Sequence, residues 1–204
     1  MPRIAYEFSK GRDEQVKEYI KKALFLTLIV LLPCCTGMMA VANNFVPIFL
    51  GAEFADTYKI LIMLCPTMVF IGISNVTGIQ YLVAVNKNRE LTISYFVALI
   101  INLILNFLLI PRWGVYGAVI GTVAAEGASA LVQYYYMSKY IGKTIESVVL
   151  LKLLLLSIIM GICVYLINYL EMAHMFTLII QVIVGVLIYG GGILYIKSHR
   201  REKC

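Results

Sequence analysis

The chain has 204 residues, of which 61% are hydrophobic and 14% are charged, and its mean hydropathy is +0.89. A soluble domain is typically about 45–50% apolar and about 25% charged, so the composition excludes that class and predicts an all-α, polytopic membrane helix bundle. The formal net charge of +6 would also suit a nucleic-acid-binding protein, but the placement of the basic residues, given below, accounts for it, and no nucleic-acid partner is expected.

The first 22 residues are polar and amphipathic, and they carry both signs of charge. They predict a helix or loop on the membrane surface that connects to the first span from the cytoplasmic side. We expect no cleavable signal peptide, because the apolar run that follows is too long for the core of one.

Six apolar runs follow, and each is long enough to cross a hydrocarbon core, which takes about 20 helical residues. Short loops join them and leave no room for a soluble domain. Pro33 and Pro66 lie inside the first two runs and predict bends there. The predicted spans are 23–49, 60–85, 91–110, 115–137, 147–170 and 175–196, and a basic cytoplasmic tail, 197–204, ends the chain.

The basic residues predict the orientation of these spans. Of the 17 lysines and arginines, 15 fall on the side of the N-terminus, and only Lys59 and Arg112 fall on the opposite side. Cytoplasmic loops carry the excess of lysine and arginine in membrane proteins. We therefore expect a multi-pass protein of the cytoplasmic (inner) cell membrane with both termini in the cytoplasm.

The residues that most enzymes need are missing from this sequence. The two histidines, His174 and His199, lie in a loop and in the tail, and no zinc-protease or phosphate-loop motif is present. The five cysteines have neither the spacing of a metal site nor that of a redox pair. We therefore expect no catalytic residue, no metal site, no cofactor and no enzymatic activity, and a transport role is favoured.

The span at 115–137 carries two different lines of residues. Gly117, Gly121 and Ala125 recur every four residues, which lets a neighbouring helix approach closely, so we assign them to helix packing. A polar line on the same helix must face protein or a water-filled cavity, because a carboxylate in lipid is costly. Cavity lining and pure packing remain equal alternatives for that line, which consists of Thr122, Glu126, Ser129 and Gln133.

Two other spans carry polar side chains at helical spacing. Asn102 and Asn106 are four residues apart in the span at 91–110, where they pair with the polar line across the hairpin or face a shared cavity with it. In the span at 60–85, Ser74, Thr77 and Tyr81 share one face and are candidate cavity-lining residues, whereas Asn75 and Gln80 point elsewhere. Static architecture is the alternative for both spans.

At this point the sequence resembles a known family. The segment LNFLLIPRWGVYGAVIGTVAAE is similar to a motif of the polysaccharide transporter family, the O-antigen and capsule flippases of the MOP exporter superfamily. MPRIAY and PIFLGAEFADTYK resemble two further boxes of that family, and the likeness covers residues 1–140, while the last two spans match only in hydropathy. The matching residues of the first motif are Asn102, Asn106, Pro111, Gly114, Gly117, Ala118 and Thr122, with Gly121 in place of the usual alanine.

The resemblance implies a MATE-like, MOP-type C-terminal lobe. Members of the family have 12 to 14 helices in two lobes and move undecaprenyl-pyrophosphate-linked oligosaccharide to the outer leaflet for polysaccharide biosynthesis. We therefore expect the C-terminal half of such a flippase, which needs the missing N-terminal lobe, or a half-size protein that pairs with a second subunit. Arg3, at the mouth of the expected cavity, is the nearest candidate for a phosphate contact.

Three other functions remain open at this stage. A cation-coupled multidrug exporter of the same superfamily would use Glu126 as its cation site. The chain could instead be a non-catalytic subunit of a polysaccharide export complex, which would need neither a cation site nor a transport path of its own. A membrane glycosyltransferase or acyltransferase is disfavoured, because the loops lack the clustered acidic residues that such an enzyme needs.

Overall fold

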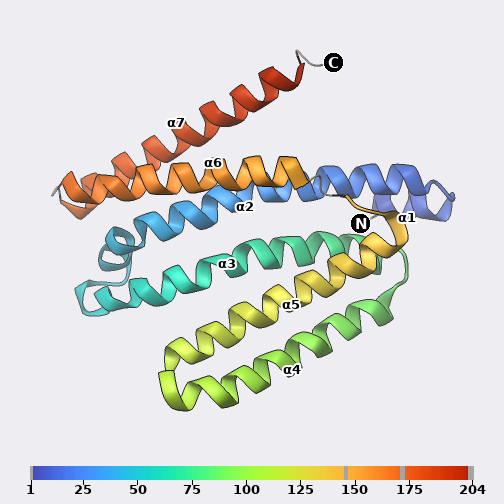
Figure 1. The fold of residues 1–204 in the computed structure, drawn as a ribbon, viewed down its shortest axis with the longest axis horizontal. Helices are drawn as coiled ribbons and strands as arrows, with labels where there is room; N and C mark the ends of the chain where they lie inside the picture. Colours follow the sequence, from blue (N-terminus) through green and yellow to red (C-terminus); the bar gives the residue numbers. More distant parts are fainter. Residues whose placement is uncertain (1, 145–146, 171–172, 202–204) are drawn as a thin grey trace. The chain divides into compact units, whose positions relative to one another are not determined.

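The computed structural model describes residues 2–144, 147–170 and 173–201, and no strand occurs within these ranges. Six helices in the described part of the chain are long and apolar enough to cross a membrane. This confirms the prediction of an all-α, six-span membrane helix bundle. Figure 1 shows the helices in chain order.

The chain divides into two compact units. Unit 1 holds residues 1–31 and 66–150, and unit 2 holds residues 32–65 and 151–204. The division falls inside α2 (Asp13–Phe49) and α3 (Tyr58–Ser74), beside Pro33 and at Pro66 respectively. Each of these prolines removes one backbone hydrogen-bond donor from its helix.

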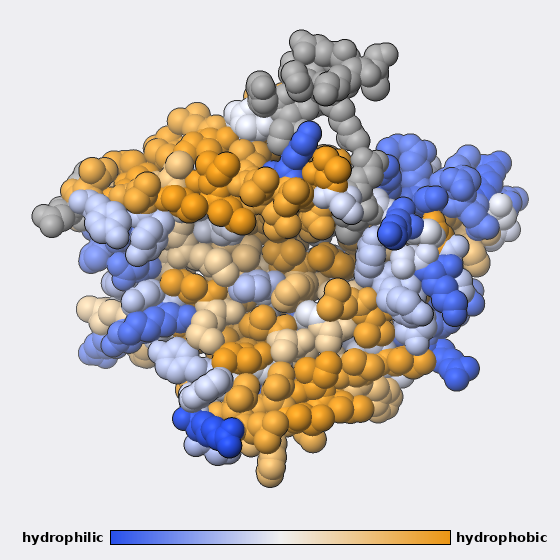
Figure 2. All heavy atoms as spheres, in the orientation of Figure 1, coloured by the Kyte–Doolittle hydropathy of each residue, from blue (hydrophilic) through white to orange (hydrophobic). Residues whose placement is uncertain are grey.

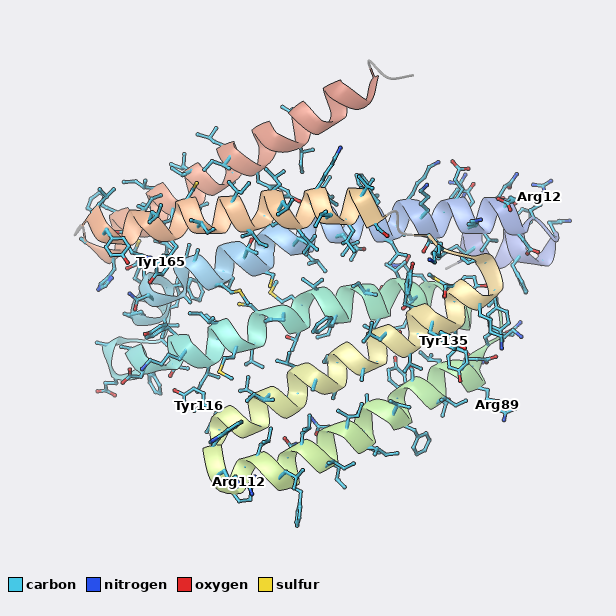
Figure 3. All side chains as sticks on the ribbon, viewed as in Figure 1. Arg12, Arg89, Arg112, Tyr116, Tyr135 and Tyr165 are labelled. Carbon is cyan, nitrogen blue, oxygen red and sulfur yellow. The ribbon has the colours of Figure 1, made fainter. Side chains whose placement is uncertain are left out.

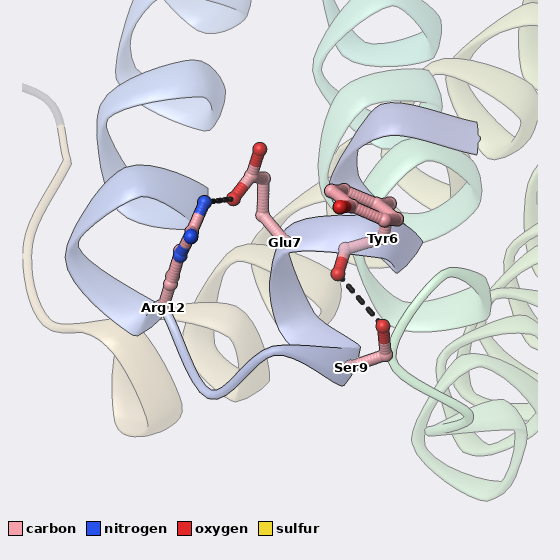
Figure 4. A network of polar contacts seen from close by, with 4 residues as sticks. All are labelled: Tyr6, Glu7, Ser9 and Arg12. Carbon is pink, nitrogen blue, oxygen red and sulfur yellow. Dashed lines mark hydrogen bonds and ion pairs between the residues drawn. The ribbon is translucent and has the colours of Figure 1, made fainter.

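Unit 1 begins with the short helix α1 (Pro2–Ser9), which folds back onto the start of α2. Gly11, at a φ of +68°, permits the reversal. Arg12 closes the turn, because its guanidinium lies 3.2 Å from the carboxylate of the largely buried Glu7, and Ser9 Oγ donates to the Tyr6 carbonyl at 2.7 Å (Figure 4). The predicted surface connection is thus a helix, a turn and the first turns of α2.

The folded-back end of unit 1 has its own hydrophobic cluster. One face of α1 and the start of α2 pack against residues 76–85, which follow α3, and against α5 (Val115–Ile141). With 37 residues, α2 is about 55 Å long, which exceeds the roughly 30 Å of a hydrocarbon core, so its polar start extends beyond the apolar layer. The buried members of the cluster are Ile4, Val16, Ile20, Leu24, Val76, Tyr81, Leu82, Val85 and Met137.

The helix that begins with α3 does not keep a single geometry. From Ser74 it continues as the π-helix η2 (Asn75–Val83), in which the backbone hydrogen bonds span five residues. The sequence predicted one regular span at 60–85, so this change of register is a finding of the structure. It alters which side chains share a face.

Helices α4 (Asn88–Trp113) and α5 form an antiparallel hairpin. The predicted spans 91–110 and 115–137 left residues 111–114 as the connection, and the structure shortens it: α4 continues through Pro111 to Trp113, and Gly114, at a φ of +53°, reverses the chain alone. Arg89 and Arg112 mark opposite ends of α4 (Figure 3). Hydrophobic residues cover its outer side, while hydrophilic residues gather around α1 and the start of α2 (Figure 2).

Unit 2 comprises the second half of α2, the 3-10 helix η1 (Ala52–Thr57), the start of α3, most of α6 (Ser147–Leu166, from Leu151 onward), the 3-10 helix η3 (Ile167–Leu170) and α7 (His174–Arg201). Small residues bring its helices close together. A Cβ at Gly161 of α6 would lie 3.3 Å from Thr36 Cβ of α2, and one at Gly192 of α7 would meet the Leu156 side chain of α6. The side chains of the predicted basic tail, 197–204, lie outside the described residues.

Candidate functional site

The small residues of α5 lie against α4. A Cβ added at Gly117 would stand 2.5 Å from the Leu109 carbonyl carbon, and one added at Gly121 would collide with Asn106 Oδ1. Ala125 is buried on the same helix. Close contact of backbones is what small-residue spacing permits between membrane helices, and it sets the distance between α4 and α5 in unit 1.

The two asparagines of α4 lie at this seam. Asn106 Nδ2 donates to Asn102 Oδ1 at 2.9 Å, and Asn106 Oδ1 is buried without a hydrogen-bond partner among the described residues. A shallow groove follows the same stretch of α4 and is lined by Asn102, Leu103, Asn106, Phe107, Ile110 and Pro111. The pair therefore retains an acceptor inside an apolar span.

Gln133 is the centre of a buried polar cluster in unit 1. Its Nε2 donates to Ser94 Oγ and to Ser129 Oγ, each at 3.0 Å, and its Oε1 lies 3.3 Å from Thr77 Oγ1. Gln133, Thr77 and Ser94 are completely buried, and Ser129 is nearly so. The cluster joins η2, α4 and α5, so these side chains hold helices together in the packed interior of unit 1.

The polar line predicted on α5 is therefore divided in two. Its other half, Thr122 and Glu126, lies outside the Gln133 cluster: Thr122 is exposed and Glu126 is half-buried. Thr122 Oγ1 donates to the Ala118 carbonyl at 3.0 Å, whereas no hydrogen bond or ion pair from Glu126 to another described residue is present. Glu126 is thus a carboxylate within an apolar span whose oxygens remain free to accept hydrogen bonds or to bind a cation.

The face predicted on the second span, with Ser74, Thr77 and Tyr81, points into the packed interior of unit 1. Thr77 and Tyr81 are buried in the packed interior, and Ser74 Oγ is buried without a described partner. The polar residues that η2 presents on its outer side are Asn75, which is exposed, and Gln80, which is half-buried. Gln80 Nε2 donates to Asn75 Oδ1 at 3.1 Å.

Arg3 lies at the exposed end of unit 1. Its guanidinium carbon is 4.6 Å from the ring centroid of Tyr19, so the charge rests on an aromatic face. Nearby on the hairpin, Tyr140 donates to Glu90 at 2.6 Å, and Lys87 Nζ lies 4.5 Å from the Tyr140 ring centroid. These contacts secure the same end of the hairpin. The described residues contain no group of three or more histidine, cysteine or acidic side chains suited to a metal ion.

Unit 2 holds an amide cluster that the sequence reasoning did not select. Asn44 Nδ2 donates to Asn168 Oδ1 at 2.6 Å and to Gln181 Oε1 at 3.2 Å, and Gln181 Nε2 donates to the Val164 carbonyl at 3.1 Å. Asn44 Oδ1 lies 2.8 Å from His174 Nδ1. Because Asn44 Oδ1 is an acceptor, His174 Nδ1 carries the hydrogen. In the sequence, the only sign of this cluster is that Asn44, Asn168 and Gln181 are amide residues inside apolar runs.

Comparisons with known proteins give the family. The family model for the lipid II flippase MurJ matches residues 1–186. The chain is 22% identical over 141 residues to the probable low-salt glycan biosynthesis flippase Agl15 of Haloferax volcanii, covering 69% of this chain and 30% of that protein. It is 24% identical over 174 residues to the lipid II flippase MurJ of Bacillus subtilis, covering 83% of this chain and 32% of that protein.

A solved structure shares the fold. The lipid II flippase MurJ in its inward closed conformation superposes with a TM-score of 0.82 at 21% identity, over 97% of this chain and 42% of that one. The chain thus spans about a third of the length of the curated relatives it matches. The resemblance to the MOP superfamily is supported at the level of a multi-pass membrane flippase, and the matching model is that of MurJ. The chain belongs to the MurJ family of lipid II flippases.

Proposed function

We propose that this chain is the C-terminal lobe of a flippase that moves a polyprenyl-diphosphate-linked saccharide from the cytoplasmic to the outer leaflet of the cell membrane. One observation carries the proposal: the MurJ family model extends over residues 1–186 and so includes helices from both units. The relatives are transporters, which agrees with a function that is not enzymatic.

The substrate class follows from what the relatives share. One is named a lipid II flippase and another a probable low-salt glycan biosynthesis flippase, and we take a lipid-linked saccharide as the substrate class for this chain. An undecaprenyl-pyrophosphate-linked oligosaccharide, as in O-antigen and capsule synthesis, is the substrate that the sequence motifs favour, and lipid II is the one that the family model favours. Both have a diphosphate between a long lipid and a sugar.

Several residues take roles in this proposal. Glu126 and Thr122 line the path of the polar headgroup or hold a coupling cation, because they lie outside the packed Gln133 cluster. Asn102 and Asn106 contribute amides at the α4–α5 seam. Arg3, on the basic and hence cytoplasmic side, is the candidate for a diphosphate contact. Ser129, Gln133, Thr77 and Tyr81 position the helices.

One observation keeps a second transporter function in view. The carboxylate of Glu126 has no described ion-pair or hydrogen-bond partner, and an unpaired intramembrane carboxylate is a typical cation or proton site. A cation-coupled exporter of the same superfamily would use it in that way. Both functions require a transport path through the membrane, and they differ in the substrate.

Complementation tests the proposal. The chain is expressed alone, and together with the N-terminal lobe of a MurJ-family protein, in one strain depleted of its lipid II flippase and in another that lacks its oligosaccharide flippase. Rescue of either strain only when both lobes are present supports a half-transporter and identifies the saccharide class. Rescue by the chain alone replaces the two-lobe proposal with a self-assembling one, and failure in every setting contradicts the flippase function.

A further inference from the structure

The outer side of η2 carries a pair of amides that no family match assigns. Gln80 Nε2 donates to Asn75 Oδ1 at 3.1 Å, and Asn75 is exposed. Both belong to a helix long and apolar enough to cross the membrane, from Ala52 to Val83. Exposed amides in such a helix are costly against lipid, because lipid offers them no hydrogen-bond partner.

The π geometry creates this pair. In an α-helix, residues five apart lie about 140° apart around the axis, since each residue turns by about 100°, so Asn75 and Gln80 would point in different directions. In η2 the backbone hydrogen bonds connect residues five apart, which brings these two side chains onto one side. Such π segments occur frequently at functional sites.

The inner side of η2 holds the segment in place. Val76, Thr77 and Leu82 are completely buried or nearly so. A Cβ at Gly78 would collide with Gln133 Oε1 and would lie 2.9 Å from Leu91 Cδ1, so the π segment presses directly on α4 and α5. The amide pair therefore projects from a backbone that is fixed from behind, which is the arrangement a binding site requires.

The free bonding groups on this side define the ligand chemistry. Each amide has two donor hydrogens and an acceptor oxygen, and their mutual bond uses one hydrogen of Gln80 and one lone pair of Asn75. Residues 66–85 contain no charged side chain. Neutral donors and acceptors without a cation suit sugar hydroxyls rather than a diphosphate.

We propose that Asn75 and Gln80 form a saccharide-binding pair that hydrogen-bonds the sugar hydroxyls of the lipid-linked substrate. This inference rests on the proposed flippase function and adds a location for the sugar within unit 1. The diphosphate binds elsewhere in this scheme, because η2 offers it no positive charge. The pair contributes to recognition of the saccharide and leaves recognition of the lipid to other parts of the protein.

The test measures binding to the purified protein together with the N-terminal lobe of a MurJ-family protein. The probes are radiolabelled lipid II, an undecaprenyl-diphosphate-linked oligosaccharide without peptide, and undecaprenyl diphosphate without sugar. The variants are Asn75→Leu and Gln80→Leu. The matched control is Asn88→Leu, an exposed amide at the start of α4. Thermal unfolding in detergent verifies that each variant folds. If Asn75→Leu does not fold, Asn75→Ser, which keeps a hydroxyl, replaces it.

We expect each leucine variant to bind the better saccharide probe about tenfold more weakly, as for the loss of a typical hydrogen bond, and to bind undecaprenyl diphosphate like the wild type. The Asn88→Leu protein should bind all probes normally. Equal binding of the saccharide probe by wild type and variants, or equal weakening with and without the sugar, overturns the amide-pair assignment alone. A wild-type protein that binds none of the three lipids overturns the flippase proposal with it.

Discussion

Gln133 Oε1 occupies the position that a side chain at residue 78 would need. A Cβ built on Gly78 collides with that oxygen and comes within 2.9 Å of the Gln133 amide carbon. The same oxygen lies 3.3 Å from Thr77 Oγ1. The glycine thus lets the backbone of η2 approach the polar cluster that joins η2, α4 and α5.

We expect Gly78→Ala to destabilise the protein by about 1–3 kcal/mol, because overpacking forces neighbouring groups to move and here the neighbour is a hydrogen-bonded amide. Thermal unfolding in detergent measures the change. The matched control is Gly191→Ala in α7, where a Cβ would have no neighbour within 4 Å. Loss of stability in both proteins, or in neither, would show that contact with Gln133 does not restrict residue 78.

The seam between α4 and α5 gives a second prediction. Gly117→Val places a branched side chain against the Leu109 backbone, 2.5 Å from its carbonyl carbon, and a backbone cannot give way as a flexible side chain can. We expect the hairpin to open, with lower thermal stability measured by unfolding in detergent. Gly190→Val, in open space on α7, is the control, and an unfolding temperature of Gly117→Val equal to that of the wild type would contradict a close seam.

Glu126 and Gln133 lie on one helix, but a substitution at Glu126 should lower transport, whereas one at Gln133 should lower stability. We expect Glu126→Gln to leave stability within about 0.5 kcal/mol of the wild type, because the carboxylate has no described partner, and to lower transport at least about tenfold. Gln133→Leu should instead cost about 1–3 kcal/mol, because it removes the bonds to Ser94 and Ser129.

The measurements for this pair are thermal unfolding and flippase complementation with both lobes present. A Glu126→Gln protein that transports as well as the wild type would remove Glu126 from the transport path. A Gln133→Leu protein of normal stability would show that the buried cluster does not hold η2, α4 and α5 together.

The amide cluster of unit 2 offers a comparison between neighbouring residues. Asn44 is buried and bonded to Asn168 and Gln181, whereas Asn43 is exposed. We expect Asn44→Leu to cost about 1–3 kcal/mol, because it leaves the buried amide of Gln181 with one partner fewer. Asn43→Leu should have little effect on the unfolding temperature. Equal changes in the two proteins would contradict a stabilising role for the cluster.

The sequence by itself determined the membrane class and the six helices, because hydropathy and span length depend only on the local composition. It also placed Gly117 and Gly121 on one side of α5, since that follows from the period of an α-helix. Two helices continue past the predicted spans. α2 begins at Asp13 and α5 ends at Ile141 because polar turns there pack on a cluster formed with α1.

Only the tertiary structure decided which polar side chains are buried and which are open. Thr122, Glu126, Ser129 and Gln133 follow one helical line, yet Ser94 of α4 and Thr77 of η2 cover only the last two. The α-helical period could not pair Asn75 with Gln80, because their contact needs π geometry. Asn44 and Gln181 are 137 residues apart in the chain, so no local pattern relates them, and the packing of α2 against α6 and α7 in unit 2 brings them together.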